Sequence, residues 1–262
     1  MPPTPLPPIL YEDDFLLAFD KPGGLLTAPG NMEKEGVNLM QLVHEQKGAN
    51  IFNVHRLDRG TSGVLLCAKD KTSLDFLCGL FQSRKIEKRY LAICHGAPPR
   101  QEDCIDLPIG EDFRRPGFMR VAKGGRPSQT RYRVLEQFRG HVWLEVFPLT
   151  GRTHQIRVHL KAIGCTIMVD PLYGDGRPFY LSAIKPAYKL KRGAIERPLI
   201  KRLALHAERL ALIHPQTREP LVIQAPAPKD FEITLKYLRR FLPRGGQSEN
   251  AGNPSHADVL VP

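Results

Sequence analysis

Stretches with a two-residue apolar period alternate along the chain with stretches of helical apolar spacing, so we expect both strands and helices. Residues 9–21 predict a hairpin of two short strands around an acidic turn. The apolar run at 64–68 predicts a buried strand, and residues 90–94 are rich in strand formers. Residues 130–138 and 141–148 predict two paired strands, which with the earlier ones imply a large sheet.

Four stretches with apolar residues at helical spacing are expected to be helices. Side-chain oxygens at a helix start accept free backbone N–H groups, which makes Ser, Thr and Asp good caps. Thr72 or Ser73 is therefore expected to cap the second helix. Thr150 or Thr153 is expected to start the third, and Asp230 to cap the last. The first two helices are expected at residues 38–46 and 71–84. The third is expected to extend to residue 163 and the fourth to residue 242.

Length and composition narrow the class of protein. A chain of 262 residues can bury a core without disulfides or metals. Its 38 Lys and Arg against 27 Asp and Glu give a net charge of +11, which favours nucleic acid as a partner, with an anionic membrane surface second. The five cysteines are scattered, as expected for reduced thiols in a cytoplasmic protein. The chain lacks a membrane-spanning apolar stretch and a signal-peptide core, so we expect no membrane contact.

One folded domain is expected, at residues 9–243. A proline-rich extension, residues 1–8, precedes it, and residues 244–262 have too few apolar residues to fold and are predicted to be disordered. Residues 177–202 form a basic, proline-interrupted insertion, for which substrate contact and a disordered loop are both open. Basic, glycine-rich loops between residues 114 and 127 are either solvated surface or contacts for an RNA backbone. We expect a monomer.

The candidate chemistry is densest at residues 55–63, where Asp58 lies between Arg56 and Arg59 and is followed by Thr61. Nearby opposite charges favour the ionised form, so the two arginines are expected to hold Asp58 as a carboxylate. A lone Asp in a loop more often caps a turn or forms a simple ion pair. The decision between these roles needs the surrounding sequence.

A second candidate is Tyr90, which follows a basic segment that includes Lys88. A tyrosine at the start of a strand is commonly a core or interface residue. Aromatic rings interleaved with Lys and Arg also suit a flipped base that stacks while its phosphates are held nearby.

The third candidate is the stretch at residues 149–160, which includes Arg152, His154 and Arg157. His154 and Arg157 are three positions apart and can share one face of a helix. A surface helix with merely solvated basic residues is the simpler interpretation. His154 and His159 are five positions apart rather than four, which argues against a helical metal pair.

These stretches resemble the signature motifs of the RluA-type pseudouridine synthases. Residues 55–63 match the motif HRLDxxTSG, Tyr90 falls in KxYxA, and residues 150–159 match TGRxHQxRxH. The lead-in KPxGLL, a DxxYG turn and a closing LxLHAxxLxxxHP pattern extend the resemblance over about residues 9–228. The resemblance implies that Asp58 is the catalytic aspartate, that Tyr90 packs against the target uracil and that Arg157 lies beside Asp58.

The family resemblance also implies a fold and an activity. The implied fold is α+β, a single domain with a long, mixed, mostly antiparallel sheet flanked by helices and an RNA-binding cleft. The implied activity is the isomerisation of uridine to pseudouridine in transfer RNA and/or ribosomal RNA, without a metal or other cofactor. Arg56 would fill the space of the flipped uridine. Contacts to RNA are further expected from Arg59, Thr61, Lys88, Arg152 and His154.

Three points stay open at this stage. Asp58 can act as a nucleophile on the anomeric carbon or as a base on the ribose. No separate amino-terminal RNA-binding module is expected, which slightly favours a small stem-loop such as transfer RNA. The rival interpretations are an inactive RNA-binding or ribosome-assembly protein of the same fold and a glycosidase- or nuclease-like enzyme. The latter needs further carboxylates near Asp58, and the three motif stretches contain only Glu87.

Overall fold

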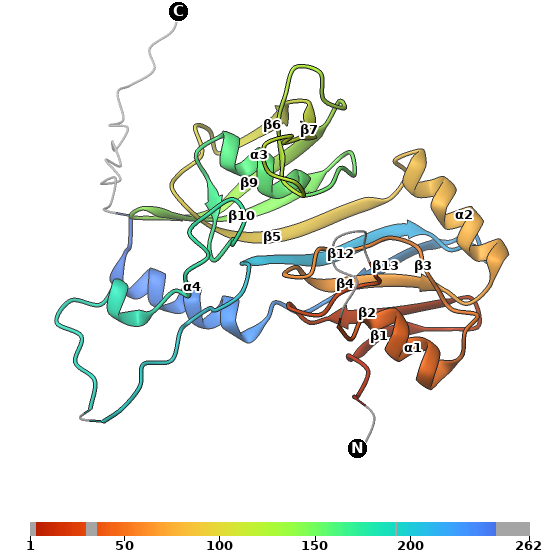
Figure 1. The fold of residues 1–262 in the computed structure, drawn as a ribbon, viewed down its shortest axis with the longest axis horizontal. Helices are drawn as coiled ribbons and strands as arrows, with labels where there is room; N and C mark the ends of the chain where they lie inside the picture. The colour runs from red at the N-terminus through yellow and green to blue at the C-terminus, as the bar shows by residue number, and fades with distance from the viewer. Residues whose placement is uncertain (1–3, 30–35, 192, 245–262) are drawn as a thin grey trace, which may run out of the picture.

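A computed structural model describes residues 4–29, 36–191 and 193–244, and within them a long sheet of eleven strands crosses the molecule (Figure 1). All strand pairs in it are antiparallel except β4 with β12, so the expected mixed, mostly antiparallel sheet is confirmed. Its main path runs through β1 (Ile9–Glu12), β2 (Leu16–Lys21), β4 (Ser62–Ala68), β12 (Leu205–Ile213), β5 (Glu87–His95), β10 (His141–Pro148), β9 (Gln129–Phe138) and β6 (Glu102–Asp106). Three short strands pair beside this path: β3 (Phe52–Asn53), β11 (Thr166–Ile167) and β13 (Pro220–Gln224).

The helices and a separate hairpin complete the described chain. The hairpin of β7 (Ile109–Glu111) and β8 (Met119–Val121) lies beside α3 (Figure 1). None of the helices among the described residues is long and apolar enough to cross a membrane. The helices are α1 (Leu39–Lys47), α2 (Lys71–Gln82), α3 (Gln155–Ala162) and α4 (Lys229–Phe241), with a short 3-10 turn η1 (Leu181–Ala183).

The apolar run of β4 is explained by burial of the strand on both faces. Alternate residues face opposite sides of a strand. Val64 and Leu66 pack with Leu77 of α2, whereas Leu65 and Cys67 pack with Leu39 of α1. The larger core cluster lies under β5, β9 and β10, where α4 contributes Phe231, Leu235 and Leu238. The strand that follows the Asp58 loop is therefore clamped between two helices.

Three predicted helix starts are wrong. Asp70, rather than Thr72 or Ser73, caps α2, because its carboxylate accepts the N–H of Ser73 at 2.7 Å. α3 begins after His154 instead of at either threonine. Pro228 precedes α4, so Asp230 lies inside the first turn, where it pairs with Arg202. At α2 a competing local carboxylate, and at α4 a tertiary ion pair, outweighed the propensity at the predicted cap.

The closing LxLHAxxLxxxHP pattern, residues 203–215, contains two apolar runs that belong to one continuous strand, β12. Its register against β5 shifts between Ala207 and Arg209, so a local irregularity, not a turn, separates the two apolar runs. β12 runs parallel to β4 at His206 and Ala207, and a Cβ at Gly63 would lie 2.1 Å from the carbonyl oxygen of Ala207. Gly63, with φ of 109°, allows this close approach at the exit of the Asp58 loop.

The predictions for the two strand pairs, the insertion and the carboxy-terminal tail have different outcomes. The strand pairs expected at 9–21 and 130–148 are confirmed as β1 with β2 and β9 with β10. The described part of the 177–202 insertion projects as a long loop from the end of the sheet near α4 (Figure 1), anchored by a bridge between Phe179 and Ile200. The predicted disordered tail lies outside the described residues except for residue 244.

Candidate active site

Asp58 lies in the tight turn that leads into β4, and neighbouring segments hold this turn from both sides. The N–H of Thr61 donates to the carbonyl oxygen of Asp58 at 3.0 Å, which closes the turn. The hydroxyl of Thr27 bonds both the N–H and the C=O of Leu57, at 3.2 and 3.0 Å. The N–H of Gly24 donates to the carbonyl oxygen of Arg59 at 2.7 Å. The KPxGLL segment therefore fixes the backbone on which Asp58 is carried.

The cation that contacts Asp58 comes from 99 residues further along the chain. Nη1 of Arg157 donates to Oδ2 of Asp58 at 3.1 Å, and Nε2 of His154 lies 3.8 Å from the same oxygen. The expectation that the neighbouring arginines hold the carboxylate needs correction. Arg56 is exposed, and Nε of Arg59 donates to the carbonyl oxygen of Gly24. Both contacts to the carboxylate use Oδ2, so Oδ1 is the oxygen that they leave for a substrate.

Arg157 is itself fixed by a second carboxylate, Asp170. Nε and Nη2 of Arg157 donate to the two oxygens of Asp170 at 2.9 and 2.7 Å, a bidentate pair. Asp170 is 0% exposed and Arg157 is 5% exposed. Burial acts to raise the pKa of Asp170, but the hydrogen bonds and charge of Arg157 outweigh it and hold that pKa below its ordinary value. Asp170 thus turns the remaining Nη1 of Arg157 toward Asp58.

Sequence reasoning missed Asp170 as a site residue, although it noted the turn that begins there. Oδ1 of Asp170 also accepts the N–H groups of Leu172 and Tyr173, at 2.9 and 3.0 Å. Asp170 lies outside the three motif stretches, in which Glu87 is the only carboxylate besides Asp58, so those stretches alone did not reveal it. Both oxygens of Asp170 are occupied by Arg157, so this carboxylate cannot serve as the acid, base or metal ligand that the glycosidase and nuclease alternatives require.

Tyr90 lies on β5, which stands in the sheet between β4, the strand after Asp58, and β10, the strand before Arg157. It pairs with Val146 of β10 and Ala207 of β12, and its half-buried ring packs against two of the core clusters. Burial and the negative charge of Asp58 both raise the pKa of Tyr90. Tyr90 is therefore a neutral phenol at pH 7, which can stack on a base and donate a hydrogen bond but is not an anionic base.

Comparison with known proteins identifies the group to which this arrangement belongs. A family model described as RNA pseudouridylate synthase matches residues 15–162, more than half of the chain. The chain belongs to the RNA pseudouridylate synthase family. It is an enzyme of that family, and the RluA-type resemblance of its motifs is confirmed by the relatives described next.

Two relatives of this family member are similar along most of their length. "Ribosomal large subunit pseudouridine synthase D" of Xanthomonas campestris is 37% identical over 240 residues, covering 88% of this chain and 69% of the relative. "Ribosomal large subunit pseudouridine synthase C" of Vibrio vulnificus is 34% identical over 231 residues, with 88% and 69% covered. Human RNA Pseudouridylate Synthase Domain Containing 4 is a similar solved structure, with a TM-score of 0.66 and 28% identity over 88% of this chain and 92% of that one.

The remaining residues that we predicted to bind RNA fall into two groups. Arg56, Arg59 and Arg152 reach the surface, the last with its guanidinium near the carbonyl oxygen of Pro127 at 3.4 Å. Lys88 is half-buried, and its Nζ lies 3.4 Å from the carbonyl oxygen of Thr150. Burial lowers the pKa of Lys88 to about 8. These four cations come from three segments: the Asp58 loop carries Arg56 and Arg59, the start of β5 carries Lys88, and the loop before α3 carries Arg152.

Thr61 requires a correction, because it is 2% exposed and cannot present its hydroxyl on the surface. Its Oγ1 has no hydrogen-bond partner among the described residues. Lys21 of the lead-in segment is also buried, at 0% exposed, and sequence reasoning did not single it out. Its Nζ donates to the carbonyl oxygens of Pro22, Leu25 and, at 3.4 Å, Arg59. Lys21 therefore links the lead-in segment to the Asp58 loop.

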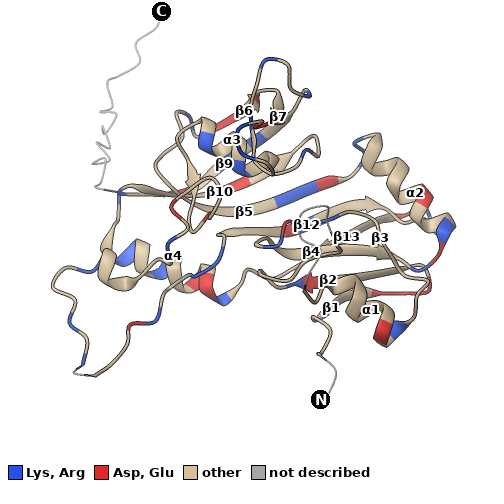
Figure 2. Cartoon of the chain, in the orientation of Figure 1, with Lys and Arg blue, Asp and Glu red and all other residues tan. Residues whose placement is uncertain are grey.

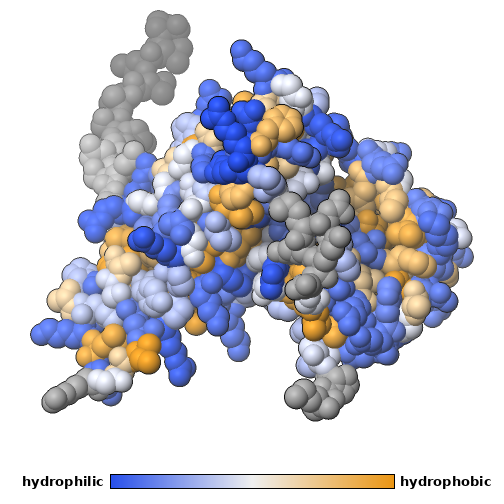
Figure 3. Space-filling model, in the orientation of Figure 1, coloured by the Kyte–Doolittle hydropathy of each residue, from blue (hydrophilic) through white to orange (hydrophobic). Residues whose placement is uncertain are grey.

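Positive charge and one aromatic ring mark the surface around the β7–β8 hairpin. Figure 2 shows Lys and Arg near the start of β5 and around this hairpin, and Figure 3 shows hydrophilic side chains gathered over it. The hairpin turn is ordered by Asp112, whose oxygens accept from the N–H of Arg114 and from Nε of Arg115. That turn presents Phe113, which is 86% exposed. An exposed ring beside cations is a suitable contact for an unpaired base.

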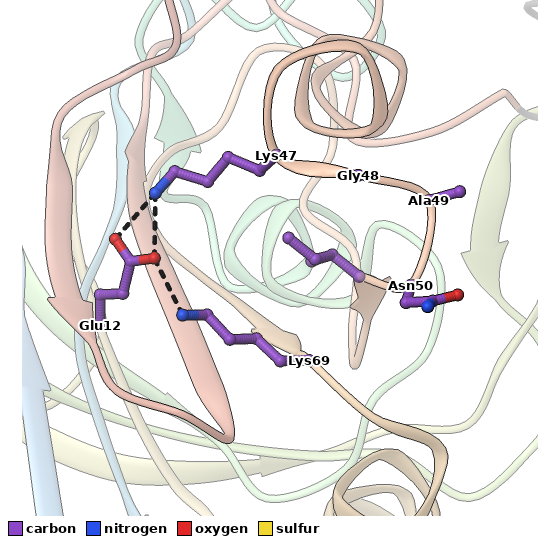
Figure 4. A pocket seen from close by; sticks show the side chains of 7 residues that line it. Glu12, Lys47, Gly48, Ala49, Asn50 and Lys69 are labelled. Atoms are coloured by element: carbon purple, nitrogen blue, oxygen red, sulfur yellow. Dashed lines mark hydrogen bonds and ion pairs between the residues drawn. The ribbon is translucent and has the colours of Figure 1, made fainter.

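A hollow of about 500 Å³ lies elsewhere, between α1 and the start of α2, and does not include Asp58 (Figure 4). Its cations are Lys47 and Lys69, and both donate to the carboxylate of Glu12 at 2.9 Å. Glu12 therefore offsets one of these two positive charges. Across the described ranges, no group of three or more His, Cys, Asp or Glu side chains is arranged to hold a metal ion.

Proposed function

We propose that this enzyme isomerises specific uridines of large-subunit ribosomal RNA to pseudouridine, with Asp58 as the catalytic carboxylate. The observation that carries the proposal is the chain of contacts from Asp170 through Arg157 to Oδ2 of Asp58. It fixes an otherwise half-exposed carboxylate in one orientation and leaves Oδ1 for the sugar. The relatives named as large-subunit synthases favour ribosomal RNA over transfer RNA as the first substrate to test.

The reaction breaks the bond from uracil nitrogen to ribose, turns the base and rejoins it through carbon 5 to the same sugar carbon. Asp58 would act either as the nucleophile on that carbon or as a base on the ribose. In both cases the carboxylate must be ionised. Arg157 places its guanidinium 3.1 Å from Oδ2 of this carboxylate.

The base needs a platform while it is detached. Tyr90 would supply it, because its ring lies on the strand between β12 and β10 and stays uncharged at neutral pH. Removal of the carbon 5 proton would then fall to water or to another group, since a neutral phenol is a poor base. Arg56, exposed on the same turn as Asp58, would fill the space that the flipped uridine leaves in the RNA.

The RNA backbone would lie across the basic side chains and the imidazole that surround this site. Arg59, Lys88, Arg152 and His154 are the positions proposed to meet it, with the β7–β8 hairpin as a further contact. A net charge of +11 supports such a polyanionic partner. We further propose that the protein acts as a monomer in the cytoplasm, where ribosomal RNA is modified, and that residues 9–243 form its catalytic domain.

The experiment is a map of pseudouridine in ribosomal and transfer RNA from cells with and without this protein. Cells complemented with wild type, Asp58→Asn or Asp175→Asn complete the comparison. Asp175 is exposed and lies outside the Asp58 cluster, so it controls for the substitution itself. We expect one or a few sites in large-subunit RNA to vanish, and to return with wild type and Asp175→Asn alone.

Two other results would redirect the proposal. Loss of sites in transfer RNA alone would keep the activity and change the substrate. Unchanged maps together with RNA bound by the purified protein would support the alternative, an RNA-binding or ribosome-assembly protein of the same fold without turnover.

A further inference from the structure

Tyr173 connects the site to the β7–β8 hairpin, and the roles assigned above do not use it. It follows Asp170 in the turn after β11 and is 5% exposed. Its hydroxyl accepts the N–H of Met119, the first residue of β8, at 2.9 Å. The same hydroxyl lies 2.8 Å from Nδ1 of His154. A buried tyrosine hydroxyl with two partners is a specific arrangement rather than packing alone.

The hydrogens in this chain of contacts can be assigned by counting donors. Burial raises the pKa of Tyr173, so its hydroxyl keeps its hydrogen at neutral pH. Met119 already donates to that oxygen, and the acceptor within reach of the hydroxyl hydrogen is Nδ1 of His154. Burial lowers the pKa of His154, although Asp58 acts in the opposite direction, so the imidazole is neutral. A neutral imidazole that accepts at Nδ1 carries its hydrogen on Nε2.

His154 combines an unusual backbone conformation with a side chain directed at Tyr173 and Asp58. Its backbone has φ of 55° and ψ of 18°, the left-handed region that non-glycine residues rarely adopt. It occupies the cap of α3, yet its side chain makes no capping hydrogen bond. The ring instead meets the edge of Tyr173, with centroids 5.5 Å apart, and directs Nε2 to within 3.8 Å of Oδ2 of Asp58. Local strain of this kind persists where surrounding contacts determine it.

We propose that Tyr173 fixes His154 in the tautomer with its hydrogen on Nε2, and that His154 thereby positions Asp58 for the reaction. Arg157 donates to Oδ2 at 3.1 Å and the Nε2–H group faces the same oxygen from 3.8 Å, so rotation of the carboxylate would break the bond to Arg157 and turn Oδ2 away from the imidazole. Oδ1 stays directed toward the sugar. Tyr173 and His154 are positioning residues, because Tyr173 acts through His154 and His154 acts through Asp58. The effect on catalysis rests on the proposed function, whereas the tautomer does not.

The tautomer can be read in the free protein. Long-range hydrogen–nitrogen NMR spectra of the chain, labelled with nitrogen-15 in its nine histidines, report which ring nitrogen carries hydrogen. The His154 signals are assigned by their loss in His154→Gln. We expect hydrogen on Nε2 in wild type and a mixture of tautomers in Tyr173→Phe. Tyr132→Phe is the matched control, because Tyr132 is 1% exposed and its hydroxyl has no partner within the described residues.

The effect on catalysis is measured as single-turnover conversion of an unmodified transcript of large-subunit ribosomal RNA. Tyr173→Phe should slow the reaction about 10- to 100-fold, the effect of one lost hydrogen bond near a charge, with RNA affinity unchanged. Tyr132→Phe should leave the rate unchanged. At position 154, Gln keeps an N–H near the place of Nε2, whereas Asn tolerates the left-handed backbone better. Positioning of Asp58 predicts that Gln retains more activity than Asn, and a purely structural role predicts the reverse.

Each result bears on one part of the proposal. Hydrogen on Nδ1 of His154 in wild type overturns it. A Tyr173→Phe rate equal to that of Tyr132→Phe overturns the positioning role, as does higher activity of Asn than of Gln at position 154. If wild type itself does not convert the transcript, the ribosomal substrate fails, and the NMR result still decides the tautomer.

Discussion

Replacement of Asp170 by Asn tests whether the site depends on its buried ion pair. Asn has nearly the same shape and can still accept the N–H groups of Leu172 and Tyr173 through its oxygen. Its NH₂ group, however, would face Nε of Arg157, where Oδ2 of Asp170 now accepts at 2.9 Å. The substitution therefore leaves a guanidinium that is 5% exposed without its bidentate partner.

Loss of one partner from a buried ion pair costs about 3–5 kcal/mol of unfolding free energy, because the remaining charge stays desolvated. This chain contains a matched control. Arg202 and Asp230 form the same bidentate contact at 2.7 and 2.8 Å, but their side chains are 18% and 28% exposed. Asp230→Asn should therefore cost at most about 1 kcal/mol, because water screens the pair. Urea denaturation of both variants, with slopes compared to wild type, measures the difference.

The same substitution should lower activity beyond its effect on stability. Without Asp170, Nη1 of Arg157 is no longer held 3.1 Å from Asp58, and a displacement of about 1 Å in a catalytic group costs about 100-fold in rate. Turnover is measured below the unfolding transition of each variant. Equal unfolding free energies for Asp170→Asn and Asp230→Asn would refute the burial argument, and full activity of Asp170→Asn would refute the role of Asp170 in orienting Arg157.

Three further outcomes are expected. Gly63→Ala should lower the unfolding free energy by at least about 4 kcal/mol or prevent folding, because the new Cβ would lie 2.1 Å from a backbone oxygen of β12. Gly124→Ala is the control and should fold normally, because a Cβ there meets no atom within 4 Å. Thermal unfolding compares the two variants. Phe113→Ala should weaken RNA binding by about 1–3 kcal/mol in a filter-binding titration. Ile195→Ala is the control, because Ile195 is 91% exposed and is expected to leave the affinity unchanged. An equally unchanged affinity in Phe113→Ala would exclude base stacking on Phe113. Burial lowers the pKa of His206 to about 4, below its unfolded value of 6.5, so the unfolded chain takes up the proton first and stability falls as pH drops from 6.5 toward 4. Between pH 7 and 5 the wild type should lose about 2 kcal/mol more unfolding free energy in urea titrations than His206→Gln, which still contains His55, another buried histidine whose pKa is lowered to about 4.

Local sequence was sufficient wherever the cause of structure is itself local. The apolar period of β9 and β10 predicted their pairing, and the unbroken apolar run of β4 predicted a buried strand. Asp58, Tyr90 and Arg157 could be named as candidates because each stands in a motif with many specified positions. The family followed from the same motifs, since the spacing of these residue types is much more specific than any single one.

Only the tertiary structure decided which charges meet. Arg56 and Arg59 are the sequence neighbours of Asp58, yet its ion-pair partner is Arg157, because the fold brings α3 to the loop that precedes β4. Asp170 and Tyr173 were visible as a turn, but their hydrogen bonds to Arg157 and His154 depend on where that turn packs. Helix starts failed for a related reason: a nearby carboxylate or a tertiary ion pair competes with the capping propensity that a sequence window measures. Sequence determines which groups are present and how the chain coils locally, and long-range packing determines which of those groups lose water and act on one another.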